Sequence, residues 1–127
     1  MHDDYKSAAI RHLDDAVALQ TAGRFDNAGH LIGFAAECAV KLRIKGLRPV
    51  ATSPHGHFPE LLIAARKQLG PRSGYDRMYD LLKGGVFNNW DVNRRYDSTG
   101  DTAQAEVIEW TRLTKQLFAA AGLKGTK

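Results

Sequence analysis

An apolar helical segment with a single carboxylate constrains the fold of this chain more than any other feature. Residues 31–42 read LIGFAAECAVKL, and Glu37 is the acidic residue among them. On a helical projection of residues 28–45, one wide face is apolar, formed by Ala28, Leu31, Ile32, Ala35, Ala39 and Leu42. Glu37 falls on the other side with His30 and Lys41, in a narrow stripe bordered by more apolar residues. Such a helix is typical of the centre of a domain, where a carboxylate needs a partner.

Breaker residues divide the rest of the chain into further helices, and no stretch alternates with the two-residue period of a strand. We expect helices at residues 3–22, 25–45, 59–69, 75–82 and 102–121. The turn at Gly23 is short, so the first two helices should pack antiparallel. The expected buried stripe of the first helix is Ala9, Leu13, Ala16 and Val17, and that of the last is Val107, Trp110, Leu113, Thr114, Leu117 and Ala121. The prediction is an all-α up-and-down helical bundle of four to five helices.

Length and composition fit one soluble domain over residues 1–127. A chain of 127 residues with 43% hydrophobic residues can bury a core without disulfides or metal. The one cysteine, Cys38, lies in the apolar helix and is expected to be a core residue. No run is long enough for a membrane span and the N-terminus is unlike a signal peptide, so the prediction is a cytoplasmic protein with no membrane contact.

Charge is uneven along the chain. Residues 1–40 hold three Lys or Arg against six Asp or Glu, whereas residues 41–77 hold eight against two. A basic middle third can attract phosphates of RNA or a nucleotide. It can equally be a solvated surface that meets an acidic partner.

The loop before the last helix holds the candidate partners of Glu37. Trp90 precedes Arg94, Arg95 and Tyr96, and either arginine could grip the Glu37 carboxylate in two hydrogen bonds. The other would then face solvent or a phosphate. The alternatives are a local pair between Glu37 and Lys41, one turn on, and a purely structural ion pair that ties this loop to the bundle.

Motifs for other chemistries are missing. The histidines, including His57 before the third helix, lack the cysteine partners and the HExxH spacing of zinc sites, so no metal and no cofactor are predicted. No phosphate-binding glycine loop and no nucleophile elbow is present.

Several segments together resemble the HEPN superfamily, small helical-bundle domains of prokaryotic toxin–antitoxin, defence and RNA-linked proteins. The resemblance spans most of the chain. It is carried by Ala8, Leu13 and Ala16, by Gly23-Arg24-Phe25 with Ala28, by Ala35-Ala36-Glu37 with Lys41, by His57, and by Arg95-Tyr96. It implies a HEPN-like fold and a homodimeric or heterodimeric bundle, of which we expect the homodimer, with a nucleotidyltransferase-like protein as a candidate further partner. It also implies that Arg94, Arg95, Tyr96, Glu37 and Lys41 contribute to ligand binding.

Active members of this superfamily are metal-independent ribonucleases with an arginine followed, after four to six residues, by a histidine. Arg94 or Arg95 matches the arginine, but the histidine positions hold Thr99, Gly100, Asp101 and Thr102. The resemblance therefore favours a non-catalytic or degenerate dimeric binding module for a partner protein or a nucleotide or RNA ligand. The alternative is a toxin-like, metal-independent ribonuclease that uses Arg94 or Arg95 with His30 or His57 as the proton carrier. Self-association is also expected from Phe34, Val40 and Ile44, which form an apolar surplus on the far side of the second helix.

Overall fold

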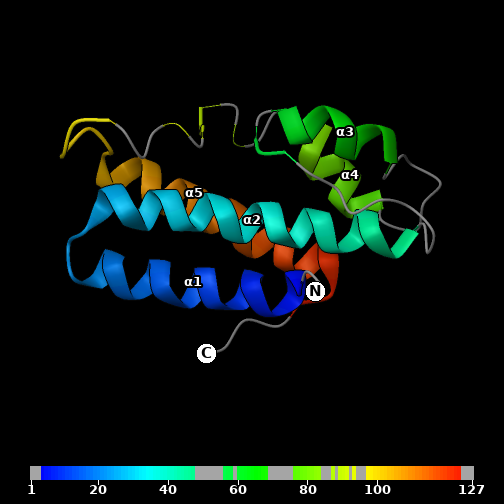
Figure 1. Cartoon of the computed structure of the whole chain (residues 1–127), viewed down its shortest axis with the longest axis horizontal. Coiled ribbons are helices and arrows are strands. Elements are labelled where there is room, and N and C mark those ends of the chain that lie inside the picture. Colours follow the sequence, from blue (N-terminus) through cyan, green and yellow to red (C-terminus); the bar gives the residue numbers. More distant parts are fainter. Residues whose placement is uncertain are drawn as a thin grey trace.

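Five α-helices make up the regular structure of the chain (Figure 1). The computed structural model describes residues 4–47, 56–58, 60–68, 76–83, 87, 89–91, 93 and 97–123. The helices are α1 (Tyr5–Thr21), α2 (Phe25–Leu47), α3 (Glu60–Gln68), α4 (Asp76–Lys83) and α5 (Gln104–Ala121). Across these ranges no residue is in a strand, which confirms the prediction of an all-α bundle.

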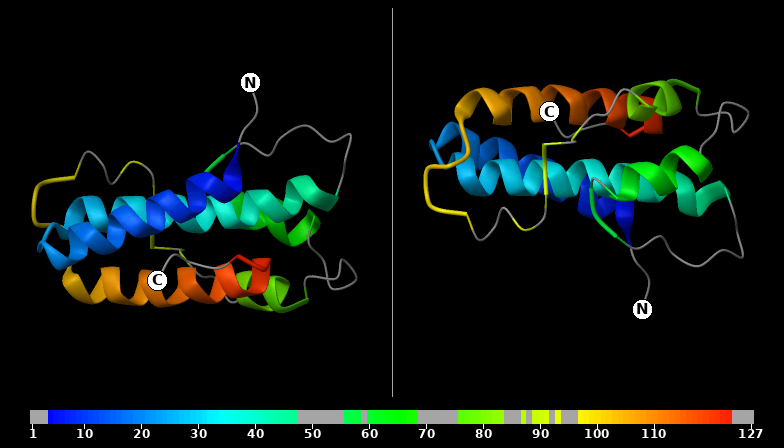
Figure 2. Two further views of the ribbon diagram at one scale, coloured as in Figure 1. Left: turned by 90° about the horizontal axis from the view of Figure 1, so that it is seen from below. Right: turned by 90° about the horizontal axis from the view of Figure 1, so that it is seen from above.

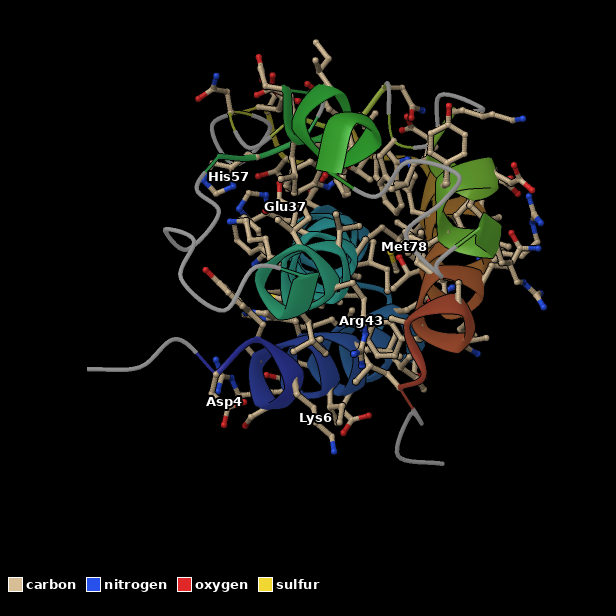
Figure 3. The ribbon with its side chains drawn as sticks, turned by 90° about the vertical axis from the view of Figure 1, so that its right-hand side faces the viewer. Asp4, Lys6, Glu37, Arg43, His57 and Met78 are labelled. Atoms are coloured by element: carbon tan, nitrogen blue, oxygen red, sulfur yellow. The ribbon has the colours of Figure 1, made fainter. Side chains whose placement is uncertain are left out.

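Helix α2 is the central element. Seen along the bundle, α1, α3 and α5 lie around it, and α4 packs against α3 and α5 (Figure 3). The α1–α2 pair is an antiparallel hairpin, as expected from the short turn at Gly23. Figures 1 and 2 show α5 lying beside α2 and running in the same direction, because the chain returns along the bundle before α5 begins.

The ends of α1 and α5 follow from their local sequence. The Asp4 carboxylate accepts a hydrogen bond from the Ser7 backbone N–H at 2.9 Å and so caps the start of α1. Beyond the end of this helix, Gly23 has φ +77°, a conformation that favours glycine. Gly122 closes α5 with φ +76°, as a left-handed C-cap. The predicted bounds of all five helices agree with the structure to within two residues.

Small residues let the helices approach closely. Ala9 and Ala16 of α1 and Ala35, Ala36 and Ala39 of α2 are all buried, and they form one core with larger side chains of the other helices. The core includes Trp110, Leu117 and Phe118 of α5. Phe118 is 3% exposed, although it was left out of the predicted stripe, whereas Leu113 is only half-buried.

Two expectations about apolar side chains were wrong. Val17 was placed in the buried stripe of α1, but its exposure is 41%, so the neighbouring helices do not cover that edge of the stripe. Val40 and Ile44 were expected to await a partner, but they are buried by the chain itself at 0% and 6% exposure. Since α3 and the segment before it pack on that side of α2, these residues leave no apolar surplus there, and only Phe34 stays half-buried.

Candidate functional site

The Glu37 carboxylate, in the middle of α2, is held by the segment that leads into α3. Glu37 is 2% exposed, one of the few buried charged or polar side chains among the described residues. Its Oε1 lies 2.9 Å from Nδ1 of His57, and its Oε2 accepts a hydrogen bond of 2.7 Å from the Phe58 backbone N–H. Figure 3 shows the Glu37 and His57 side chains meeting between α2 and the start of α3.

The start of α3 explains why this carboxylate fits. The His57 carbonyl oxygen accepts a hydrogen bond from the Leu61 N–H at 2.8 Å, so a hydrogen-bonded turn leads into α3, which begins at Glu60. The Phe58 N–H then belongs to the first turn, where backbone donors lack a helical acceptor. A carboxylate supplied by α2 satisfies this donor and is also favoured by the positive end of the helix dipole. Glu37 therefore caps α3 from a neighbouring helix.

Burial and hydrogen bonding act in opposite directions on the Glu37 carboxyl. Burial raises the pKa of Glu37 above its usual value, while the hydrogen bonds from His57 and Phe58 and the nearby charge of Lys41 oppose that rise. When ionised, the carboxylate can only accept, so His57 donates from Nδ1. Its second ring nitrogen, Nε2, is then left for solvent or a ligand, and the His57 side chain is 45% exposed.

Aromatic rings surround the half-buried Phe34 next to this pair. The ring centres of His12, His30 and His57 lie 5.7, 4.5 and 5.9 Å from that of Phe34. The Trp90 ring is 5.7 Å from it and also stacks on His30. Burial, followed by the Arg11 charge, lowers the pKa of His12, and Asp15 opposes this. The three histidines come from α1, α2 and the segment before α3.

Two tryptophans fix the loop between α4 and α5. Nε1 of Trp90 donates a 2.9 Å hydrogen bond to the Gly29 carbonyl oxygen of α2, and the ring is 1% exposed. Nε1 of Trp110 donates to Oδ1 of Asn89 at 3.0 Å. The Asp26 carboxylate of α2 accepts hydrogen bonds from the backbone N–H groups of Gly100 at 2.8 Å and Thr102 at 3.1 Å. The loop is thus attached to α2 on both sides of residues 94–96.

The sequence-predicted site residues are partly brought together. Glu37 and His57 are in direct contact, and Lys41 is close enough for its charge to lower the pKa of Glu37. His30 lies on the same side through its contacts with Phe34 and Trp90. Arg94, Arg95 and Tyr96 lie outside the described residues, so their predicted contact with Glu37 stays a prediction. The alternative was a local ion pair between Glu37 and Lys41. The ion pairs among the described residues do not include this one.

Sequence reasoning considered Glu37 and His57 separately and missed their hydrogen bond. A signal was present: His57 directly precedes a helix whose first backbone donors need an acceptor, and Glu37 is the lone carboxylate of the apolar helix. Cys38, the neighbour of Glu37, was expected to be a core residue; it is half-buried and packs against the core. Burial raises the pKa of its thiol to about 11, so it is not a thiolate near neutral pH.

This arrangement can bind an anion and can orient one imidazole. Lys41 supplies a positive charge, and His57 presents a ring fixed in direction by a buried carboxylate. Within the ranges that the structure describes, no three potential metal ligands come together, and no helix has the length and apolar character that a membrane crossing needs. Comparisons of this chain with protein-family models, curated proteins and solved structures gave no match.

Proposed function

We propose that this protein is a non-catalytic, HEPN-like binding module that acts as a dimer and binds a nucleotide or RNA through its phosphates. A nucleotidyltransferase-like protein is the proposed further partner. The observation that supports this function most is the pairing of Glu37 with His57. It orients a half-exposed imidazole, and the charge of Lys41 acts on the same carboxylate, on a chain with formal net charge +4.

The same pairing favours binding over catalysis. Both carboxylate oxygens of Glu37 already accept hydrogen bonds, one from His57 and one from the Phe58 N–H in the turn that leads into α3. Glu37 therefore stabilises the fold and is not available as a base. Phosphate binding needs only positive charge and hydrogen-bond donors, and the Lys41 ammonium supplies both. The arginines at positions 94 and 95 are proposed to add to the same ligand contact.

Binding of a fluorescent single-stranded RNA at several salt concentrations tests this proposal. We expect Lys41→Ala to weaken binding and to reduce the slope of log affinity against log salt by about one. Lys115→Ala is the matched control, because it removes the same charge from an exposed position on α5. Equal binding by wild type and Lys41→Ala, or no binding of RNA and nucleotides at low salt, would contradict the proposal.

A second candidate, a metal-independent ribonuclease, is favoured by one observation. A buried carboxylate on Nδ1 of His57 leaves Nε2 to take the proton of a ribose 2′-hydroxyl while that oxygen attacks the adjacent phosphorus. Arg94 or Arg95 would hold the phosphate, and the leaving 5′-oxygen would take a proton from a second donor such as His30. Cleavage of the same RNA in EDTA, abolished by His57→Ala and by Arg95→Ala, would establish this activity in place of the binding function.

A further inference from the structure

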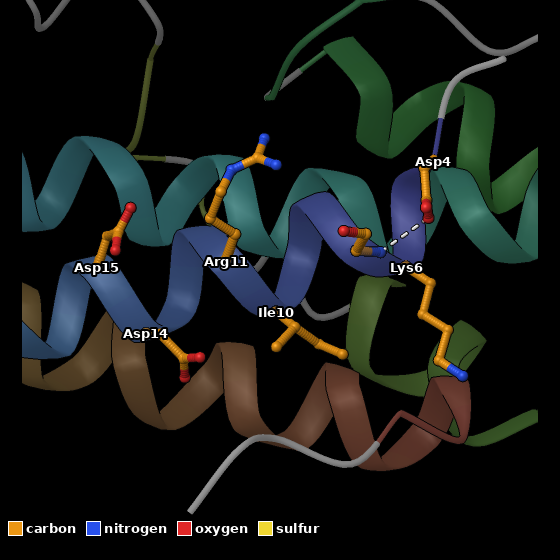
Figure 4. A pocket seen from close by; sticks show the side chains of 7 residues that line it. Asp4, Lys6, Ile10, Arg11, Asp14 and Asp15 are labelled. Atoms are coloured by element: carbon orange, nitrogen blue, oxygen red, sulfur yellow. Dashed lines mark hydrogen bonds between the residues drawn. The ribbon is translucent and has the colours of Figure 1, made fainter.

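Two basic side chains on neighbouring helices take no part in the ion pairs among the described residues. Arg11 belongs to α1 and is exposed, whereas Lys41 belongs to α2 and is half-buried. Figure 4 shows the Arg11 side chain on the opposite side of α1 from Lys6 and Asp14. Both positive charges are therefore available to an anion from outside the chain.

The directions of the two side chains follow from the helices that carry them. In an α-helix the Cα–Cβ bonds tilt toward the N-terminus, so a long side chain covers the turn before its own residue. Arg11 therefore leans toward Ala8, three residues earlier on α1. Lys41 leans toward Cys38, three residues earlier on α2.

The packing of the two helices brings these two positions together. Helices α1 and α2 are antiparallel, and the ring centres of His12 and Phe34 lie 5.7 Å apart. Four residues back from His12 is Ala8, and four residues on from Phe34 is Cys38. Ala8 and Cys38 thus face each other across the two helices, and both are small and half-buried. We call this place the Ala8–Cys38 junction.

The electrostatics of Cys38 agree with this convergence. Burial raises the pKa of the Cys38 thiol, and the charges of Lys41 and Arg11 both oppose that rise. The two charges thus reach the same side chain from different helices. Cys38 directly follows Glu37, whose carboxylate holds His57, so the junction adjoins the proposed ligand site.

The carboxylates near the junction do not neutralise these charges. Asp15 lies one turn beyond Arg11 on α1, and the Arg11 side chain leans away from it. The Asp4 carboxylate accepts a hydrogen bond from the Ser7 N–H at the start of α1. Both oxygens of Glu37 accept hydrogen bonds from the segment before α3. A ligand at the junction therefore meets two cations from two helices.

The geometry points to a site for two adjacent phosphates at the Ala8–Cys38 junction, where Arg11 and Lys41 each bind one of them. The planar guanidinium of Arg11 can grip two oxygens of one phosphate, and the Lys41 ammonium binds the other as a compact charge. Two adjacent phosphates occur in a nucleoside diphosphate and along an RNA strand. This inference rests on the proposed function and specifies its ligand and a further binding residue, Arg11.

Calorimetric titration with ADP and AMP tests whether a second phosphate is bound. We expect wild type to bind ADP about tenfold more tightly than AMP, because the second phosphate gains a cation of its own. Arg11→Ala and Lys41→Ala should each reduce this ratio to within about twofold. Lys6→Ala is the matched control, because it removes the same charge from the other side of α1 and should leave the ratio unchanged.

Salt-dependent binding of single-stranded RNA distinguishes the two sources of phosphate. If successive phosphates of RNA occupy the site, Arg11→Ala should reduce the slope of log affinity against log salt by about one, as Lys41→Ala does. An unchanged slope, together with a lost preference for ADP, would assign the site to a nucleoside diphosphate.

The same measurements separate failure of this inference from failure of the proposed function. Binding of ADP and RNA by Arg11→Ala as tight as that of wild type, with weak binding by Lys41→Ala, would overturn the inference alone. Wild type that binds neither RNA nor nucleotides at low salt would overturn both.

Discussion

The indole of Trp90 occupies the space that a side chain at Gly33 would need. A Cβ at position 33 would lie 2.0 Å from Cε2 of Trp90. The tryptophan therefore lies directly on the backbone of α2, next to Phe34 and His30, and its ring nitrogen is bound to the Gly29 carbonyl oxygen. A glycine in mid-helix lowers the stability of the helix on its own. Here its missing side chain leaves the space that the Trp90 ring needs to hold the loop against α2.

We expect Gly33→Ala to destabilise the fold by about 2 kcal/mol or more, because the buried Trp90 ring would have to move. Gly29→Ala should be milder, since the nearest atom to its Cβ, Cζ3 of Trp110, is 2.9 Å away. Urea unfolding of both variants measures this. If Gly33→Ala were as stable as wild type, the close contact would not exist in solution. The double variant Gly33→Ala, Trp90→Ala should lose less than the sum of its single changes.

Glu37→Gln should lower the free energy of unfolding by about 1–3 kcal/mol, because the amide cannot accept from both His57 and the Phe58 N–H as the carboxylate does. Burial raises the folded-state pKa of Glu37 above 4.5, so the folded protein binds the Glu37 proton more tightly than the unfolded chain does. The stability gained from this proton is complete below pH 4.5 and declines as pH rises through the folded pKa. Unfolding in urea at several pH values measures both effects. Glu109→Gln is the control, since that carboxylate is exposed and pairs with Arg112 on the surface. An unchanged melting temperature for Glu37→Gln would mean that α3 does not depend on this cap.

His12 should make the fold less stable in mild acid. Its folded-state pKa is lowered by burial, so the neutral ring contributes stability above the usual value of 6.5, and this is lost as pH falls through the folded pKa. Because the ring is only half-buried, we expect an effect below about 1 kcal/mol between pH 7.5 and 5.5. Comparing wild type with His12→Gln by urea unfolding at both pH values isolates it. Equal losses of stability in the two proteins would show that His12 does not cause this pH dependence.

Cys38 should resist alkylation in the folded protein. A thiol pKa of about 11 in place of 9.0 leaves about one hundredth of the usual thiolate at pH 8. We expect iodoacetamide to modify native Cys38 about 100-fold more slowly than the same residue in urea, as followed by mass spectrometry. Similar rates in both states would place the thiol in open solvent.

Asp26→Ala should loosen the loop that precedes α5. The carboxylate binds the N–H groups of Gly100 and Thr102, so its removal leaves both donors without this acceptor. Amide exchange at these two positions should speed up by about tenfold or more, while exchange in the middle of α1 stays unchanged. Asp101→Ala, which removes an exposed carboxylate from the same loop, serves as the control for loss of one negative charge.

The helices could be predicted from sequence because each is marked by local signals. Asp4, Gly23 and Gly122 set the ends of helices, and the three- and four-residue spacing of apolar residues sets their buried faces. Val17 shows the limit of that spacing. A period says which positions share a face, but how far a neighbouring helix covers that face depends on tertiary packing.

The site was harder to predict than the fold. Glu37 could be identified as a buried carboxylate needing a partner, because it is alone in an apolar helix. Its actual partners, His57 and the Phe58 N–H, come from a connection whose path no local pattern specifies. The Phe58 backbone N–H could not be recognised from its side chain, because every residue except proline carries such a donor. Sequence reasoning favoured an arginine because charge pairing is the commonest answer for a buried carboxylate, and it did not consider hydrogen bonds from His57 and the Phe58 N–H.

The central position of α2 has a consequence for the order in which this chain folds. Its contacts with α1 join residues close in sequence across the short turn at Gly23, whereas its contacts with α5 await residues about 80 positions later. On the ribosome, the α1–α2 hairpin is complete while the last helix has yet to be synthesised. Until α5 arrives, the face of α2 that it covers is exposed to chaperones and to other nascent chains. The alanines of this helix expose less apolar surface area during that interval than larger apolar side chains would.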